Sequence, residues 1–257
     1  MGGYFSYYEP DNNKHHNWIR DYLDNRDLNE SYIEKSDIKY MDLRKYCPGI
    51  YNSKLKDSVS SALAAIYEYY KIIDNNNYID IPSRLFMYYN ERKLINTIGH
   101  DSGSQIRIGL KAINKFGVSR EKLWNYNVDN LTLKPPDKCY IISEETIHYF
   151  RLRQDLNTLK QSLIRKQPFV FGCTVYSEFL LSKLNGGVLL LPYKAEKVLD
   201  YISFMCVGYD DEKAHFIIRN NQGLLWGDKG YGYIPYKYIL NKELCTDFWS
   251  FKIRDKE

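Results

Sequence analysis

The chain has 257 residues, a mass of 30.5 kDa and a net charge of +4, enough for one large domain or two small lobes. Its 44% apolar and 26% charged residues are ordinary for a globular protein and exclude collagen-like, disordered and coiled-coil classes. The small net charge and the lack of a dense Lys/Arg run argue against nucleic acid as a partner. The 25 tyrosines, together with frequent Asn, Ile and Lys, indicate an AT-rich genome such as that of a large DNA virus.

The N-terminal sequence has no secretory signal, and no apolar run reaches the roughly 18–20 residues that span a membrane. These features predict a cytoplasmic protein, located in the host cytoplasm or the virion if the source is a virus. Met1–Ser6 matches the pattern for myristoylation of Gly2, although the pattern is short enough to arise by chance. A single acyl chain would give only weak, reversible membrane association.

Residues 1–40 are polar and aromatic without strong periodicity, which predicts an extended arm with a short turn around Trp18–Leu23. After Pro48-Gly49, Asp57 or Ser58 supplies an N-cap oxygen for a helix that ends at Asn75–Asn77. Apolar residues at helical spacing follow the cap, namely Val59, Ala62, Leu63, Ile66 and Tyr70.

Further helices are expected from Ser83 to about Lys93, from Ser104 to Lys115, and from Thr146 to Lys166. After Pro168, short apolar runs separated by Gly- and Asp-rich turns predict strands. The strands are Phe169–Val175, Ile202–Tyr209, His215–Arg219, Gly230–Ile234 and Asp247–Ile253. This segregation predicts an α+β fold with an arm (1–40), a helical lobe (41–166) and a β-rich lobe (167–257).

A series of short motifs occurs in the order found in one peptidase family. Pro82–Asn90 is close to that family's P-S-R-L-F-x-Y-Y-N, and Val207–Asp211 and Trp226–Tyr231 match its β half. The other motifs are Trp18–Asp27, Asp42–Pro48, Asp101–Gly103, Lys115–Trp124 and Asp247–Trp249. The chain therefore resembles the papain family of cysteine peptidases, in particular its short-prosegment branch in bacteria, archaea and large DNA viruses. The resemblance implies a two-lobed fold, with a cleft between a helical lobe and a β-barrel-like lobe.

That family uses a Cys nucleophile at a helix N-terminus, a His proton-transfer partner, an Asn that orients the His, and a Gln oxyanion-hole donor. The resemblance puts Ser58 at the Cys position, Ile202 at the His position and Asn220 at the Asn position. The Gln position falls within Asn52–Ser53, where Asn52 could still donate through its amide. Gln222 replaces the Trp that shields the Asn–His contact.

Both reacting groups of that chemistry are thus missing. A Ser hydroxyl is far less acidic than a thiol, and Ile cannot accept a proton. None of the five histidines is an obvious substitute, and His215 is the only one in the β half. The resemblance therefore predicts a pseudoenzyme, a non-catalytic binding, regulatory or structural protein.

The cleft of such a protein would bind a protein or peptide, lined by Asp101, Ser102, Gly103 and Gln222. One alternative is a residual hydrolase that uses Ser58 as nucleophile with an unrecognised base. Another is a small-molecule or lipid-linked role unrelated to the cleft, suggested by the Gly2 pattern. No metal-ligand spacing and no cofactor motif is present in the sequence, so neither a metal nor a cofactor is expected.

The cysteines are odd in number and widely spaced, without a C-x-x-C pair, which fits a reducing compartment. We expect all five to be free thiols. Alkylation under non-reducing conditions should add five labels in the intact mass, and fewer than five would contradict this expectation. The residues concerned are Cys47, Cys139, Cys173, Cys206 and Cys245.

Overall fold

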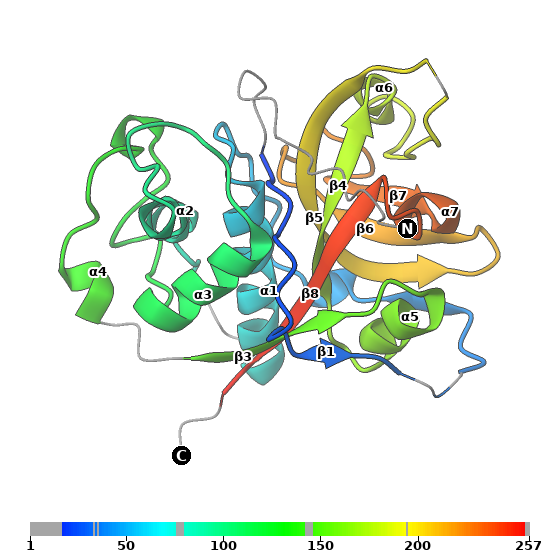
Figure 1. Cartoon of the computed structure of the whole chain (residues 1–257), viewed down its shortest axis with the longest axis horizontal. Helices are drawn as coiled ribbons and strands as arrows, with labels where there is room; N and C mark the ends of the chain where they lie inside the picture. The colour runs from blue at the N-terminus through cyan, green and yellow to red at the C-terminus, as the bar shows by residue number, and fades with distance from the viewer. Residues whose placement is uncertain are drawn as a thin grey trace, which may run out of the picture.

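The computed structural model describes residues 17–32, 34, 36–75, 80–141, 146–193 and 195–254. The Gly2 pattern, His15 and His16 lie outside these ranges. A group of helices lies beside a large twisted sheet, and the first long helix packs between them (Figure 1). Within the described ranges, none of the helices combines the length and apolar character that a bilayer crossing requires.

Three long helices form the helical side: α1 (Ser58–Asp74), α2 (Arg84–Leu94) and α3 (Ile106–Phe116), close to the predicted ranges. Ser83 starts α2 because its side chain accepts a hydrogen bond from the amide of Phe86. Gly117 ends α3 with a φ of 69°, a conformation that favours glycine. Shorter helical segments are η1 (Arg44–Tyr46), η2 (Val128–Asn130), α4 (Lys138–Ile141), α5 (Leu156–Ile164), α6 (Phe179–Ser182) and α7 (Tyr236–Ile239).

One eight-stranded sheet has the order β1-β3-β8-β4-β5-β6-β7, with β2 paired to β5. Only the β1–β3 pair is parallel among the named strand pairs of the described residues. The strands are β1 (Asn29–Glu30), β2 (Tyr40–Asp42), β3 (Ile147–Leu152), β4 (Phe169–Tyr176), β5 (Val198–Asp210), β6 (His215–Arg219), β7 (Tyr231–Pro235) and β8 (Cys245–Ile253).

The helix expected over residues 146–166 is wrong, because this segment contains both β3 and α5. Burial alternates over much of β3, as a strand packed on one face requires. Asp155 then starts α5, since its carboxylate accepts hydrogen bonds from the amide and hydroxyl of Thr158 at 2.9 and 2.8 Å. The turn expected around Trp18–Leu23 is also displaced, to Asp24–Asp27.

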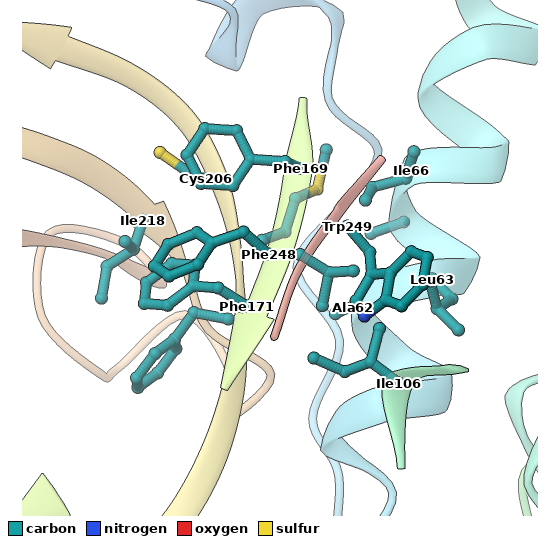
Figure 2. Packing of buried hydrophobic residues seen from close by; sticks show 14 of the residues in the cluster. Ala62, Leu63, Ile66, Ile106, Phe169, Phe171, Cys206, Ile218, Phe248 and Trp249 are labelled. Carbon is teal, nitrogen blue, oxygen red and sulfur yellow. The ribbon is translucent and has the colours of Figure 1, made fainter. Parts of the chain in front are cut away.

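Both faces of the central strands are covered. Figure 2 shows Trp249 on the side of α1, near Leu63 and Ile106, and Phe248 on the opposite side of β8. Phe248 stacks on Phe171 with ring centroids 5.3 Å apart. Successive side chains of a strand point to opposite faces, so β8 contributes to the core on both sides. The core therefore runs continuously from the helices through the sheet.

The N-terminal arm is fastened to this core by buried charges. The amide of Asp21 donates to Asp247 at 2.7 Å, and the indole of Trp249 donates to Asp21 at 2.8 Å. Arg107 pairs with Asp27 at 2.5 Å. Burial, together with the neighbouring Asp247 carboxylate, raises the pKa of Asp21 to about 7.

Glu91 is a fully buried carboxyl group in α2. One of its oxygens accepts from the Ser60 hydroxyl of α1 at 2.8 Å, and the other has no partner in the described structure. Burial raises the pKa of Glu91 from its ordinary 4.5 to about 8. The folded state therefore binds this proton more tightly than the unfolded chain does, so stability falls as pH rises between these two values.

We expect Glu91→Gln to remove this pH dependence, since the amide keeps an acceptor for Ser60 but cannot ionise. Relative to the wild-type chain, the variant should gain about 1–3 kcal/mol of unfolding free energy on going from about pH 5 to about pH 9. Urea denaturation across this range measures the difference. The exposed Glu243→Gln serves as control and should track the wild type. Parallel curves for wild type and Glu91→Gln would contradict the assignment.

Candidate functional site

Ser58 is the first residue of α1 and is 1% exposed. Its Oγ accepts two hydrogen bonds from Ser203 of β5, one from the backbone amide at 3.2 Å and one from the hydroxyl at 3.0 Å. The expectation that Asp57 or Ser58 supplies an N-cap oxygen is wrong: Asp57 holds the N-cap position without a side-chain capping hydrogen bond, and Ser58 contacts the sheet instead. The N-terminus of α1 is thereby joined directly to β5.

Ser203 is the residue that sequence reasoning missed. It follows Ile202 in a run that is otherwise apolar up to Val207. A polar residue in a buried strand needs a hydrogen-bonding partner, so this serine was a signal that something polar lies opposite. Its partner is the hydroxyl at the start of α1.

Ile202 is 4% exposed and pairs with Cys173 of β4, so its side chain is part of the core. Ser203 makes the contact with Ser58, and the alternation of the strand turns the Ile202 side chain the other way. Ile202 is not among the residues that line the small cavity beside Ser58. The structure thus brings Ser58 next to the backbone that follows Ile202, with the aliphatic side chain packed in the core.

A cavity of about 10 Å³ lies beside Ser58, with room for about one water molecule. Asn220 lines it, is 3% exposed, and its side-chain Nδ2 has no partner in the described structure. A single water would satisfy that orphan donor. The other lining residues are Tyr51, Ser61, Ala62, Ser203, Met205, Arg219 and Asn221.

No histidine is among those lining residues. Within the described part of the chain, His100 and His148 are exposed on the helical side and on β3. His215, on β6, stacks against Tyr233 with ring centroids 4.8 Å apart, and burial lowers its pKa. The described residues also contain no group of three or more His, Cys, Asp or Glu placed to hold a metal ion.

A buried carboxyl group lies under the start of α1. Asp57 is fully buried, and its Oδ2 accepts from the hydroxyls of Ser53 and Ser61 at 3.3 and 3.1 Å. Burial raises the pKa of Asp57 to about 6, although nearby Arg84 opposes the shift. The Arg84 guanidinium donates to Ser53 at 3.1 Å. These contacts turn the Asp57 carboxylate toward the helical side of the molecule.

The guanidinium of Arg84 is itself held between two aromatic rings. Its central carbon lies 4.4 Å from the ring centre of Tyr51 and 4.1 Å from that of Tyr126. This arrangement provides favourable cation–π contacts and leaves the cation little freedom to move. Arg84 belongs to the P-S-R-L-F motif, and its role here is to position the loop that precedes α1.

The loop that contains Asn52 pairs with the loop that contains Gln222. The two residues form an antiparallel bridge, and the amide of Gly223 donates to the carbonyl of Tyr51 at 2.8 Å. Both Asn52 and Gln222 are exposed, and neither lines the cavity beside Ser58. The two loops therefore connect the helical side and the sheet, while their amide side chains face solvent.

Asp101, Ser102 and Gly103, expected to line the cleft, are tied to their own lobe. The Asp101 carboxylate accepts from the amide of Lys56 at 3.1 Å and from the Tyr88 hydroxyl at 2.5 Å. The amide of Gly103 donates to the same hydroxyl at 2.9 Å. The polar groups of this segment thus position the loop before α1.

The N-terminal arm crosses between the two parts of the molecule next to these residues (Figure 1). The amide of Trp18 donates to the carbonyl of Tyr201 on β5 at 2.8 Å, and that of Ile19 donates to the carbonyl of Ser104 at 2.9 Å. The side-chain amide of Asn17 donates to Asp200 at 2.6 Å. One extended tripeptide therefore links β5 to the segment that precedes α3.

The indole of Trp18 is 2% exposed and lies against the backbone of Gly172 in β4. A Cβ atom added at Gly172 would overlap the six-membered ring of this indole. Glycine is therefore required here by the close approach of Trp18 and not by its backbone angles.

Comparison with known proteins places these features in context. The model of the family described as papain family cysteine protease matches residues 60–245. An uncharacterized peptidase C1-like protein of Acanthamoeba polyphaga mimivirus is 34% identical over 206 residues, which cover 76% of this chain and 66% of that protein. The chain thus spans slightly less than two thirds of that relative's length.

Among solved structures, xylellain, a cysteine protease from Xylella fastidiosa, superposes with a TM-score of 0.84 at 34% identity, covering 93% of this chain and 96% of that one. A digestive procathepsin L 3 of Tenebrio molitor larval midgut has a TM-score of 0.67 at 16% identity, covering 88% of this chain and 74% of that one. At 16% identity, the similarity to procathepsin L 3 shows a shared fold alone. The expected α+β, papain-like fold is confirmed.

The contact between Trp18 and Gly172 predicts strong coupling of two residues that are far apart in sequence. Gly172→Ala should cost about 1–3 kcal/mol of unfolding free energy through overpacking, and Trp18→Ala about 3–5 kcal/mol through the cavity it leaves. The double variant should lose at least about 1 kcal/mol less than the sum, because removal of the indole makes room for the new methyl group. Urea denaturation of the four proteins measures this cycle, and strictly additive losses would show that the ring does not rest on Gly172.

Proposed function

The chain belongs to the papain family of cysteine proteases, and we propose that it is a member without peptidase activity that serves as a binding, regulatory or structural protein. The observation that carries this proposal is the direct contact of Ser58 Oγ with the amide and hydroxyl of Ser203. At a working centre, the nucleophile faces a substrate carbonyl on one side and a base on the other. In this chain the Ser58 hydroxyl instead faces the strand β5, which carries Ser203.

The chemistry of peptide hydrolysis supports the same proposal. A hydroxyl becomes a nucleophile only when a base within hydrogen-bond reach takes its proton. No imidazole lines the cavity beside Ser58, and a cavity of about 10 Å³ holds about one water and no peptide group. The nearest carboxyl group in sequence, Asp57, accepts hydrogen bonds from Ser53 and Ser61 through Oδ2, and no hydrogen bond joins its other oxygen to Ser58.

We also propose a protein or peptide as the partner, bound where the family resemblance places a cleft between the lobes. The N-terminal arm already bridges the two lobes at this place, and this limits how the partner can bind. Asn17–Ile19 hydrogen-bonds to Asp200, Tyr201 and Ser104, so a ligand would bind over the arm or displace it. We further propose a viral source, and with it a location in the host cytoplasm or the virion, because the Tyr-, Asn-, Ile- and Lys-rich composition is typical of an AT-rich genome.

We expect purified protein to hydrolyse no generic peptide substrate and to resist thiol-directed epoxide inhibitors, because position 58 has neither a thiol nor a base. A fluorogenic peptide library and intact-mass labelling provide the measurement, with an active papain-family peptidase as positive control. Ser58→Ala should leave any background rate unchanged. Stoichiometric labelling of Ser58 by a serine-directed probe would instead support the residual hydrolase.

A designed restoration tests whether the centre is merely missing two side chains. Ser58→Cys combined with Ile202→His should recover little activity, since Asn52 is exposed and shorter than the family's Gln, and Gln222 is an exposed amide at the place of the family's Trp. It should also lose about 1–3 kcal/mol of stability, because an imidazole replaces a packed aliphatic side chain. Ser58→Cys alone is the matched control for both peptidase activity and thermal unfolding. Robust turnover with an unchanged melting temperature would refute a remodelled centre.

A further inference from the structure

A group of large apolar side chains is exposed on α6 and the loop that follows it. Leu184 is 84% exposed and Leu180 62%, so most of each side chain contacts solvent. Figure 1 shows α6 at one edge of the molecule, beside the upper ends of β4 and β5. We call this set the leucine surface; its members are Leu180, Leu181, Leu184, Leu190, Leu191 and Tyr193.

The backbone of this segment is anchored, so these side chains are held outward. Phe179 is buried, with its ring 5.6 Å from that of Trp226. The amide of Leu189 donates to the carbonyl of Tyr233 at 2.9 Å, and the amide of Tyr233 donates back to Gly187 at 2.8 Å. Because Leu189 points into the core, its neighbours on both sides point into solvent.

A second exposed pair extends the leucine surface. Leu224 and Leu225 are 63% and 86% exposed, and they directly precede Trp226, which packs on Phe179. Gly227, the residue after Trp226, lies against Gly187 of the α6 loop. Two loops thus present leucines at the same end of the sheet. An apolar surface of this size on a soluble domain indicates an interaction site.

The charges around the leucine surface are basic. Between Phe179 and Tyr193 the sequence has a single charged residue, Lys183, and it is exposed. Lys197 and Lys229 are also exposed. Lys197 directly precedes β5, and Lys229 lies in the loop that contains Leu224 and Leu225.

The acidic residues near the leucine surface are hydrogen-bonded or ion-paired within the protein, or are partly buried. Glu196 is 9% exposed and accepts from the hydroxyl of Ser177 at 3.1 Å and from the amide of Glu178 at 2.6 Å. Asp228 pairs with Arg44 at 3.1 Å. The Glu178 side chain is half-buried. The rim of the leucine surface therefore carries positive charge beside exposed aliphatic groups.

We propose that the leucine surface docks on an anionic lipid membrane, inserting its leucines at the level of the headgroups while Lys183, Lys197 and Lys229 contact acidic headgroups. Exposed aliphatic side chains with a basic rim are the combination that binds such an interface. A second copy of the chain is a poorer occupant, because a two-fold contact would bring the basic rims of both copies into one interface with few acidic partners.

The test is sedimentation of the full chain, produced in bacteria without N-terminal acylation, with vesicles of phosphatidylcholine alone or mixed with phosphatidylserine. The wild-type chain should pellet with the anionic vesicles and much less with the neutral ones. Leu184→Asp with Leu191→Asp should lower the partition coefficient at least about tenfold. Lys183→Ala with Lys197→Ala should lower it about tenfold or more on anionic vesicles only.

Leu133→Asp with Ile141→Asp is the matched control, since both residues are exposed, 53% and 75%, on the helical side. This variant should bind like the wild type, and circular dichroism should show that all variants are folded. The proposal is overturned if the wild type stays in the supernatant with both vesicles, or if the leucine variant binds as the wild type does. It is also overturned if sedimentation velocity shows a dimer that the leucine variant abolishes, since the surface is then an interface between copies.

Discussion

The hydrogen bonds from Ser203 to Ser58 set the separation of α1 and β5, and the geometry of the whole centre follows from that separation. An oxygen acceptor allows the helix to approach the strand more closely than a sulfur atom would. The remaining space is about 10 Å³, bordered by the orphan amide of Asn220. Because a buried hydroxyl without a partner costs free energy, loss of the Ser58 hydroxyl would leave the amide and hydroxyl of Ser203 without this acceptor, whereas after loss of the Ser203 hydroxyl the amide of residue 203 would still donate to Ser58.

Buried polar contacts also join other elements of the molecule. Glu91 and Ser60 join α2 to α1, and Asp21 ties the arm to β8. Each places a carboxyl group in a dry environment, where it holds its proton to higher pH than in water. A buried polar contact is directional, so these pairs specify one relative placement of the elements better than apolar packing alone would.

The positions of helices and strands were predicted best where a single periodicity of apolar residues extended over the whole element. α1 and the strands after Pro168 lie close to their expected ranges, because their apolar spacing is regular. β3 and α5 were merged into one helix, since the Asp155 cap is a single residue between two short patterns. The Ser58–Ser203 contact spans 145 positions and depends on tertiary packing, which periodicity cannot reveal. The motif order still gave the fold, because it samples nearly the entire chain.

The position of Trp18 also constrains the order of events during folding. Its site is built from Ser104, Gly172 and Tyr201, and the neighbouring Asp21 needs Asp247, 226 positions away. The arm is the first of these segments to leave the ribosome, yet its partners are complete only when β8 has been synthesised. Closure of such long loops is slow, and it has to follow assembly of the sheet. Until then a tryptophan is exposed on an unattached segment, and transient exposure of an apolar side chain of this size favours aggregation of the incomplete chain.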